Sequence, residues 1–358
     1  MINVIDDRAL ALAIMGALRL KRIFQKYKGV NKVKKLWIIL LSFITIFGLA
    51  ACGSSESGGS ASTDEGGGDE QLTIGISLPS ATHGWMGALI ENAEKQAKAL
   101  KESEGIDYVM TNAVDPNKQA NDVDDLIAQE VDVIVMLPIE SAALSPVGQK
   151  IKDAGIPLVI VDRELENDAA TVVVKGDNEG IGVNAGKYFV EQLKGEGKIV
   201  EISGPPSSVT EQRGAGFKEA VESEPGMEII ASQSGDFSTE KSLEVMQNIL
   251  QANPEIDAVF TQDDGMALGV LQAIKEAGRT DIQFVTGAGG AKGVFEDIQN
   301  DGLMKATFLY SPTMVEDAVK IAADIAKGEE PAESMVVKEA TQVTKENVEE
   351  YYDPESKF

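Results

Sequence analysis

Residues 131–137 read VDVIVML, a nearly all-apolar run that is typical of a strand buried on both faces of a parallel sheet. IKDAG follows at 151–155 and reads as the end of a helix closed by glycine. The same two patterns recur as IDAVF at 256–260 and IKEAG at 274–278, and the acid and the glycine stand 23 positions apart in the first copy and 21 in the second. Two copies at similar spacing predict two lobes of one type rather than a single large sheet.

The rest of the chain alternates in the same way. Residues 72–78 read as a strand, 85–104 as a helix with one apolar face, and Asp115-Pro116 as a helix start. Repeated strand–helix alternation predicts the α/β class, here two doubly wound, Rossmann-like lobes with parallel central sheets. Ligands bind such sheets at the carboxyl ends of the strands, so we expect a ligand cleft between the lobes.

This rule alone identifies candidate ligand-binding residues. They follow directly on expected strands and comprise 79–85, 137–140, 162–163, 203–210, 236–237, 262–264 and 287–290.

Cys52 is the only cysteine and follows an apolar stretch, residues 36–51, that is preceded by three lysines between positions 32 and 35. A positive start, a short apolar core and small residues at the end are the parts of a secretory signal. The stretch is shorter than the roughly 20 residues of a spanning helix. Leu-Ala-Ala-Cys at 49–52 resembles a bacterial lipobox, which predicts lipidation of Cys52 and a position outside the cytoplasm, anchored to the membrane.

The stretch of 51 residues before Cys52 is longer than a typical signal peptide. We interpret residues 1–29 as an extension from a misassigned start, with a genuine amphipathic extension as the alternative. Residues 30–51 are then the signal peptide. Residues 52–70 contain the lipidated cysteine and a tether rich in Gly, Ser and acidic residues, which cannot bury a core.

Charge limits the partners of the mature chain. Of 32 Lys and Arg and 58 Asp and Glu, nine and two precede Cys52, which leaves 23 minus 56, or −33. This balance argues against nucleic acid as a partner. A single cysteine allows no disulfide within one chain. We expect a monomer without a cofactor.

Two pairs of side chains suggest a ligand chemistry. Asp162 and Arg163 end a strand side by side, and a carboxylate beside a planar fork of donors suits two adjacent hydroxyls. Trp85 is the only tryptophan after Cys52 and Phe237 is its expected partner from the second lobe; an aromatic face suits the C–H face of a sugar. The alternatives are a plain loop ion pair and core packing.

The folded part also resembles the sugar-binding branch of the periplasmic binding proteins, closest in pattern to ribose-binding proteins, over residues 72–345. The pieces that carry the resemblance are VDR at 161–163, GDN at 176–178, RGAGF at 213–217, VMQN at 245–248 and DGMALG at 264–269. The resemblance implies three crossings between lobes, near 175–177, 309–311 and 338–340. It therefore implies a first lobe of 71–175 with 311–338, a second of 176–310 with 339–358, hinge closure on a ligand, and an ABC-type permease as partner.

The resemblance also implies site residues. The family uses the Asp162-Arg163 pair on the sugar and places a stacking aromatic at Trp85. His83 falls where the family has a polar contact, and a lone histidine cannot build a metal site, so we expect no metal. Asp263 and Tyr310 lie at or near positions where ribose binders carry amides. Each of these residues has an ordinary loop, surface or hinge role as its alternative.

Departures from the ribose pattern argue against ribose held in the usual way. Glu211 stands where ribose binders have an arginine, and it is a candidate replacement contact or a solvated loop acid. Residues 287–290 read GAGG where an aspartate is expected, and Leu137 replaces an amide.

The resulting hypothesis is a lipid-anchored solute-binding protein that captures a sugar or polyol for an ABC importer. The alternative is a lipoprotein that presents its ligand to a chemoreceptor or sensor kinase. An enzyme is not expected, because the mature chain shows no nucleophile–base pair and no metal-binding cluster. The anchor faces the outside of a one-membrane cell or the periplasm of a two-membrane cell.

Overall fold

The protein is described by a computed structural model for residues 71–356 and 358. The predictions for residues 1–70, including the signal peptide and lipidation of Cys52, lie outside this described part. Within it, no helix combines the length and apolar character needed to cross a bilayer.

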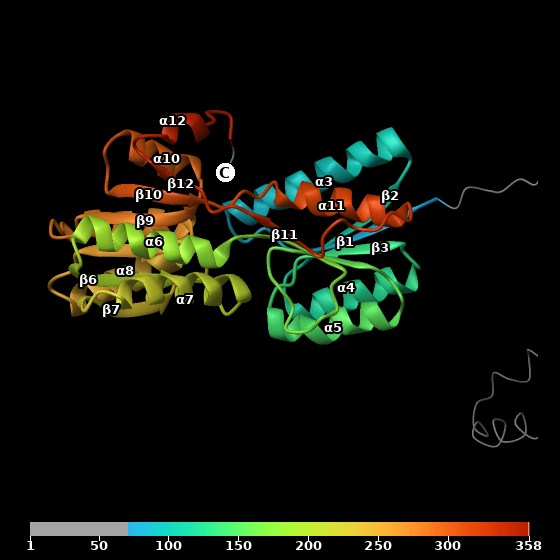
Figure 1. Ribbon diagram of the computed structural model, residues 1–358, viewed down its shortest axis with the longest axis horizontal. Helices are drawn as coiled ribbons and strands as arrows, with labels where there is room; N and C mark the ends of the chain where they lie inside the picture. The colour runs from blue at the N-terminus through green and yellow to red at the C-terminus, as the bar shows by residue number, and fades with distance from the viewer. Residues whose placement is uncertain (1–70, 357) are drawn as a thin grey trace, which may run out of the picture. The chain divides into compact units, whose positions relative to one another are not determined.

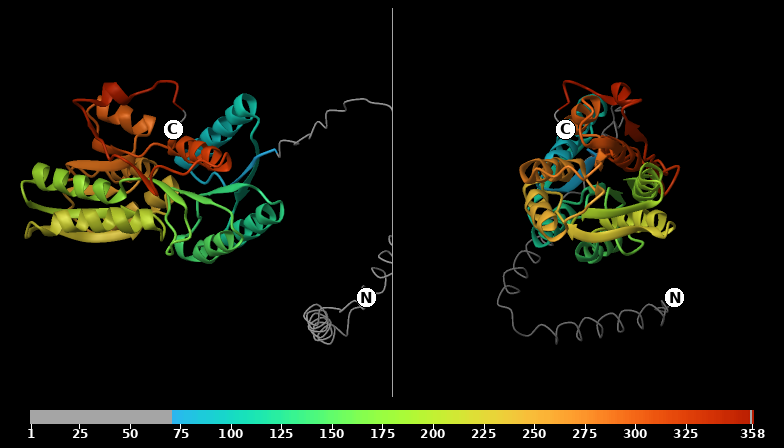
Figure 2. Two further views of the ribbon diagram at one scale, coloured as in Figure 1. Left: turned by 45° about the vertical axis from the view of Figure 1, so that its right-hand side comes forward. Right: turned by 90° about the vertical axis from the view of Figure 1, so that its left-hand side faces the viewer.

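Two six-stranded sheets form the centres of two lobes (Figures 1 and 2), and this confirms the predicted fold class. The first sheet has the order β11-β5-β4-β3-β1-β2, with all neighbours parallel. The second has the order β12-β10-β9-β8-β6-β7 and is parallel except for β12, which runs against β10.

The elements alternate as the sequence predicts. Those associated with the first sheet are β1 (Thr73–Pro79), α3 (Gly84–Glu104), β2 (Asp107–Ala113), α4 (Pro116–Ala128), β3 (Val133–Met136), α5 (Ser141–Asp153), β4 (Leu158–Val161), β5 (Val172–Gly176), α11 (Met314–Ala326) and β11 (Met335–Lys338). Those associated with the second are α6 (Asn178–Leu193), β6 (Glu196–Ser203), α7 (Ser208–Glu222), β7 (Gly226–Ser234), α8 (Thr239–Ala252), β8 (Ala258–Thr261), α9 (Asp264–Ala277), β9 (Phe284–Gly289), α10 (Lys292–Gln299), β10 (Met304–Leu309), β12 (Gln342–Thr344) and α12 (Val348–Tyr351).

The chain crosses between the lobes three times, between β5 and α6, between β10 and α11, and between β11 and β12. These are the three connections of the predicted hinge. The exact lobe boundaries given by the sequence stay a prediction.

Local sequence explains why these elements form. β3, β4 and β8 are buried along their whole length, as central strands between two helical layers must be. In the first lobe, α3 and α11 cover one face of the sheet and α4 and α5 the other (Figure 1). The helix start predicted at Asp115 is present, and its side chain accepts a hydrogen bond from the backbone N–H of Lys118.

Helix α7 approaches α6 closely because glycines stand at the crossing. A Cβ on Gly182 would lie 2.1 Å from the carbonyl oxygen of Arg213, and one on Gly216 would lie 2.5 Å from that of Glu179. Phe217 continues the contact into the core, where its ring stacks on Phe260 with centroids 4.2 Å apart. This packing determines which side of α7 faces the other lobe.

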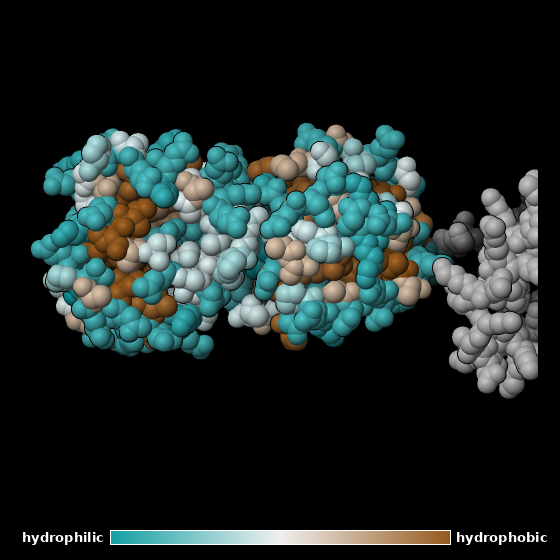
Figure 3. Space-filling model, turned by 90° about the horizontal axis from the view of Figure 1, so that it is seen from below, coloured by the Kyte–Doolittle hydropathy of each residue, from teal (hydrophilic) through white to brown (hydrophobic). Residues whose placement is uncertain are grey.

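The surface shown in Figure 3 is mostly hydrophilic, with apolar patches over both lobes. Large apolar side chains exposed in the described part are Val114, Leu268, Met335, Val337 and Tyr351.

Candidate functional site

A cavity lies between the two lobes at the carboxyl ends of their strands. Its volume is about 320 Å³, which includes space open to solvent. Its lining residues come from both lobes and from the second crossing: His83, Trp85, Asp162, Arg163, Val209, Arg213, Phe237, Asp263, Ala288, Gly289 and Tyr310.

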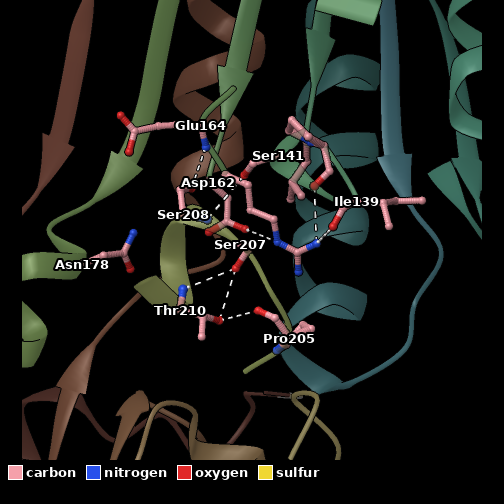
Figure 4. A network of polar contacts seen from close by, with 12 residues as sticks. Ile139, Ser141, Asp162, Glu164, Asn178, Pro205, Ser207, Ser208 and Thr210 are labelled. Atoms are coloured by element: carbon pink, nitrogen blue, oxygen red, sulfur yellow. Dashed lines mark hydrogen bonds and ion pairs between the residues drawn. The ribbon is translucent and has the colours of Figure 1, made fainter. Parts of the chain in front are cut away.

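Asp162 and Arg163 form the polar centre of the first lobe's wall, directly after β4. Arg163 Nε lies 3.6 Å from Asp162 Oδ2, and its Nη1 donates to the carbonyl of Ile139 at 2.5 Å. Asp162 has a positive φ of 68°, an uncommon backbone conformation that sets where its carboxylate projects. Both side chains are buried, and Figure 4 shows Asp162 and Ile139 within one polar network. Burial raises the pKa of Asp162, while Arg163 and a hydrogen bond from Tyr310 act against that rise.

Tyr310 connects this wall to the second lobe. Its hydroxyl donates to Asp162 Oδ1 at 2.5 Å and accepts from Asn178 Nδ2 at 3.3 Å. Its backbone carbonyl accepts from the indole N–H of Trp85 at 2.7 Å. Burial, followed by the charge of Asp162, raises the pKa of Tyr310 well above its usual value, so the phenol stays a donor. Tyr310 thus holds two candidate ligand contacts in place.

Arg213 enters the cavity from α7. Its Nε donates to Asn178 Oδ1 at 3.0 Å, its Nη1 donates to the carbonyl of Gln262, and its guanidinium carbon lies 4.3 Å from the ring centroid of Tyr310. Among the residues the structure describes, no carboxylate lies within 4.0 Å of its nitrogens, and Nη2 is buried without a hydrogen-bond partner. A buried donor without a partner is costly, so Arg213 Nη2 is a natural donor to a bound hydroxyl.

Three rings form the apolar part of the cavity. The His83 ring lies between the others, 6.4 Å from Trp85 and 5.9 Å from Phe237, measured between centroids. Trp85 comes from the first lobe and Phe237 from the second, where its positive φ of 54° sets its direction. Burial, and then the charge of Arg163, lowers the pKa of His83 to about 4, so its imidazole is neutral at pH 7.

Asp263 contributes a second carboxylate and caps α9, accepting from the N–H of Met266 at 3.0 Å. Burial, and then the neighbouring charge of Asp264, raises its pKa to about 7. Asp264 itself points away from the cavity lining and accepts from the N–H groups of Gly290 and Ala291 at 2.7 and 2.8 Å. It therefore orders the glycine-rich loop after β9 rather than offering a ligand contact.

A polar bridge joins the lobes beside the cavity (Figure 4). The N–H of Glu164 donates to Ser208 Oγ at 2.9 Å, and the N–H of Ser208 donates to Ser141 Oγ at 3.4 Å. The Glu164 carboxylate accepts from Gln212 Nε2 at 2.5 Å and from Lys175 Nζ at 2.6 Å. The lobes therefore meet across the cavity in this structure.

The structure brings together seven of the eight candidates from the sequence: His83, Trp85, Asp162, Arg163, Phe237, Asp263 and Tyr310. Glu211 is exposed on α7 and does not line the cavity. Sequence reasoning did not select Arg213 as a contact, although the RGAGF motif containing it was noted. Val209, Ala288 and Gly289 lay within the selected strand ends but were not singled out.

The described residues contain no group of three or more His, Cys, Asp or Glu side chains placed to hold a metal ion. The contacts available to a ligand are two guanidinium groups, two carboxyl groups, a neutral imidazole and aromatic faces.

Comparisons with known proteins agree with the two-lobed fold. The family described as periplasmic binding protein domain matches residues 74–330. The ribose import binding protein of Bacillus subtilis is 33% identical over 294 residues, covering 82% of this chain and 93% of the relative.

Two solved structures extend the comparison. An ABC transporter solute binding protein from Bacillus halodurans with bound myo-inositol has a TM-score of 0.74 and 26% identity, covering 80% of this chain and 98% of its own. The fructose-binding periplasmic domain of a hybrid two-component system has a TM-score of 0.72 and 27% identity, covering 78% and 93%.

Proposed function

This chain belongs to the periplasmic binding protein family, and from that membership we propose that it captures a sugar or sugar-like polyol by hinge closure and delivers it to an ABC importer. The family is one of substrate-binding proteins, which confirms that the chain is not an enzyme and supports an extracytoplasmic location.

The observation that carries the proposal is the combination of polar and aromatic groups in one interlobe cavity. Asp162 offers acceptors and Arg163 and Arg213 offer donors, which suits neighbouring hydroxyls that both donate and accept. Trp85 and Phe237 offer faces to the C–H groups of a ring. We propose the seven cavity residues selected from the sequence, together with Arg213, as the ligand contacts.

The relatives support a sugar or polyol as the ligand, but their names do not agree on one compound. Ribose and myo-inositol are the ligands in the names of two of them. Relative to the ribose pattern, the polar contacts at Leu137 and at 287–290 are lost and the arginine at position 211 is replaced by Glu211. These differences argue for a ligand other than ribose held in the usual way.

Tryptophan fluorescence tests the proposal directly. In the full chain carrying Trp37→Phe, Trp85 is the only tryptophan. Titration with D-ribose, xylitol, myo-inositol, L-arabinose and D-fructose, with L-leucine as a control without hydroxyl groups, is expected to give a saturable change with at least one polyol and none with leucine. A folded sample that responds to none of these compounds, by fluorescence and by thermal shift, would contradict the proposal.

Lipid anchoring is part of the proposal and rests on residues 49–52. Growth with a clickable palmitate analogue is expected to label the wild type, and Cys52→Ser is expected to abolish the label and release the protein from the membrane. Labelling that survives Cys52→Ser would contradict this anchor.

A sensing role is the second candidate, because a similar structure is the fructose-binding domain of a two-component system. Deleting the gene separates the two roles. Loss of uptake of the bound sugar supports delivery to an importer, whereas intact uptake with a lost transcriptional response supports sensing.

A further inference from the structure

The segment after α12 returns from the second lobe toward the first. In Figure 1 it leaves α12, turns downward, and reaches the marked end between the two lobes. We call residues 353–356 and 358 of this segment the strap.

The strap is held on the second lobe by hydrogen bonds at the start of α10. The N–H of Lys292 donates to the carbonyl oxygen of Phe358 at 3.1 Å, and the ammonium of Lys292 donates to the carbonyl of Pro354 at close range. Ser356 Oγ also donates to the carbonyl oxygen of Phe358, at 2.7 Å. These contacts give Phe358 a defined position relative to α10.

From that position the Phe358 ring reaches both lobes. A Cβ on Gly289, in the second lobe, would lie 3.1 Å from Phe358 Cζ, and one on Gly84, at the start of α3 in the first lobe, would lie 3.6 Å from Phe358 Cδ2. The ring also packs against the hydrophobic core that contains Trp85 and Leu89. One aromatic ring thus lies beside a glycine on each side of the interlobe junction.

This junction lies next to the cavity. Gly289 lines the cavity itself, and Gly84 directly precedes Trp85. Phe358 also lines a surface groove together with His83, Trp85 and Asp263, all three of which belong to the cavity wall. Opening of the lobes would separate Gly84 from Gly289 and expose the ring to water, whereas closure buries it.

We propose that the strap is a closure element, in which Phe358 stabilises the closed arrangement by seating its ring between Gly84 and Gly289. The inference rests on the hinge closure of the proposed function. The strap shifts the equilibrium between the open and closed forms and does not contact the ligand. The closed form is stabilised by apolar burial that the open form lacks.

Amide hydrogen exchange tests the strap without a ligand. The N–H groups of Glu164 and Ser208 are bonded to the opposite lobe at the polar bridge, and they belong to other elements than the strap's contacts. In the full chain, Phe358→Ala is expected to speed exchange of the peptides that contain these amides about tenfold, equivalent to about 1.4 kcal/mol in the opening equilibrium. Phe358→Leu keeps an apolar side chain and should restore most of the protection.

Val114→Ala is the control, because Val114 is an exposed apolar side chain of the first lobe that lies outside the grooves lined by Phe358. It should leave exchange at the polar bridge unchanged. A folded Phe358→Ala protein, checked by circular dichroism, in which only peptides around residues 84–88 exchange faster would overturn the proposal, since the ring would then be local packing alone.

Titration with the sugar panel distinguishes failure of the strap proposal from failure of the proposed function. If the wild type binds a panel compound, Phe358→Ala is expected to speed its dissociation about tenfold in stopped-flow fluorescence. If Phe358→Ala binds the compound with an unchanged dissociation rate, the strap proposal is wrong. If the wild type binds no compound of the panel, the proposed function is wrong, and the hydrogen-exchange experiment alone tests the strap proposal.

Discussion

The hydroxyl of Tyr310 donates to Asp162 Oδ1 at 2.5 Å, which ties the second crossing between the lobes to the central carboxylate of the cavity. Asp162 keeps its other oxygen, Oδ2, near Arg163. Tyr310 therefore prepares the carboxylate for a ligand by satisfying one oxygen and leaving the other available.

Removing this hydroxyl should weaken both folding and binding. Tyr310→Phe leaves a buried acceptor with one donor fewer, which costs about 1–3 kcal/mol in the free energy of unfolding. Since the bond holds down the pKa of Asp162, its loss should raise that pKa, so that binding fails at a higher pH as the solution is acidified. Urea unfolding and sugar titrations at several pH values measure both effects, with Tyr188→Phe as control. Equal stability in the two variants would contradict the prediction.

Loss of charge should weaken ligand binding at Asp162 and have no effect on it at Glu211. Asp162→Asn removes a charged acceptor worth about 1.5–3 kcal/mol, so affinity for the responding sugar should fall roughly tenfold to a hundredfold. Glu211→Gln should leave affinity unchanged, because the side chain is exposed outside the cavity lining. Isothermal titration calorimetry measures the affinity of both variants for the sugar. If only Glu211→Gln binds more weakly, the ligand does not bind in the cavity beside Asp162.

Asp263 should make the folded protein less stable as pH rises from about 4 to about 7. Its pKa is about 7 when folded, above the usual 3.8, so over this range the unfolded chain is ionised while the folded chain keeps its proton. The stability lost is about 1.4 kcal/mol per pKa unit, and the loss stops above the folded pKa.

The variant Asp263→Asn removes this ionisation and keeps an amide that can still cap α9. Its stability advantage over the wild type, measured by urea unfolding, should therefore grow between pH 4.5 and pH 7.5. Parallel pH profiles for the two proteins would show that Asp263 does not titrate in this range.

Gly176 should tolerate no side chain. A Cβ there would lie 2.2 Å from Cε2 of Tyr310, so Gly176→Ala should displace the phenol from Asp162 and cost about 1–3 kcal/mol of stability as well as affinity. Gly87→Ala is the matched comparison, because the nearest atom to its Cβ is the Cβ of Ala81 at 4.0 Å and it lies inside α3. That change should stabilise by up to about 1 kcal/mol. Thermal unfolding of both variants checks the contrast, and a fully stable Gly176→Ala protein that binds normally would refute it.

Much of the cavity was predictable from local pattern. Apolar runs such as 131–137 identify buried strands, and parallel strands place their carboxyl ends at one edge. For that reason the sequence alone predicts His83, Trp85 and Asp162, which follow expected strands, as cavity residues. The family resemblance added Tyr310, which does not directly follow an expected strand in that selection.

The orientation of α7 could not be obtained in this way. Glu211 and Arg213 are two positions apart, so on a helix their side chains point about 160° away from each other. Either could have faced the cleft. The close crossing at Gly182 and Gly216, and the bonds of Arg213 to Asn178 and Gln262, turn Arg213 inward and Glu211 outward.

The sequence by itself determined the α/β class, the two lobes and most strand-end residues, because these follow from the spacing of apolar and turn-forming residues along the chain. Only the tertiary structure decided which distant side chains meet. Tyr310 and Asp162 are 148 positions apart in the sequence, and Phe358 lies beside Gly84 although 274 positions separate them. Such contacts depend on how the lobes and crossings pack together, and that packing leaves no periodic trace in the local sequence.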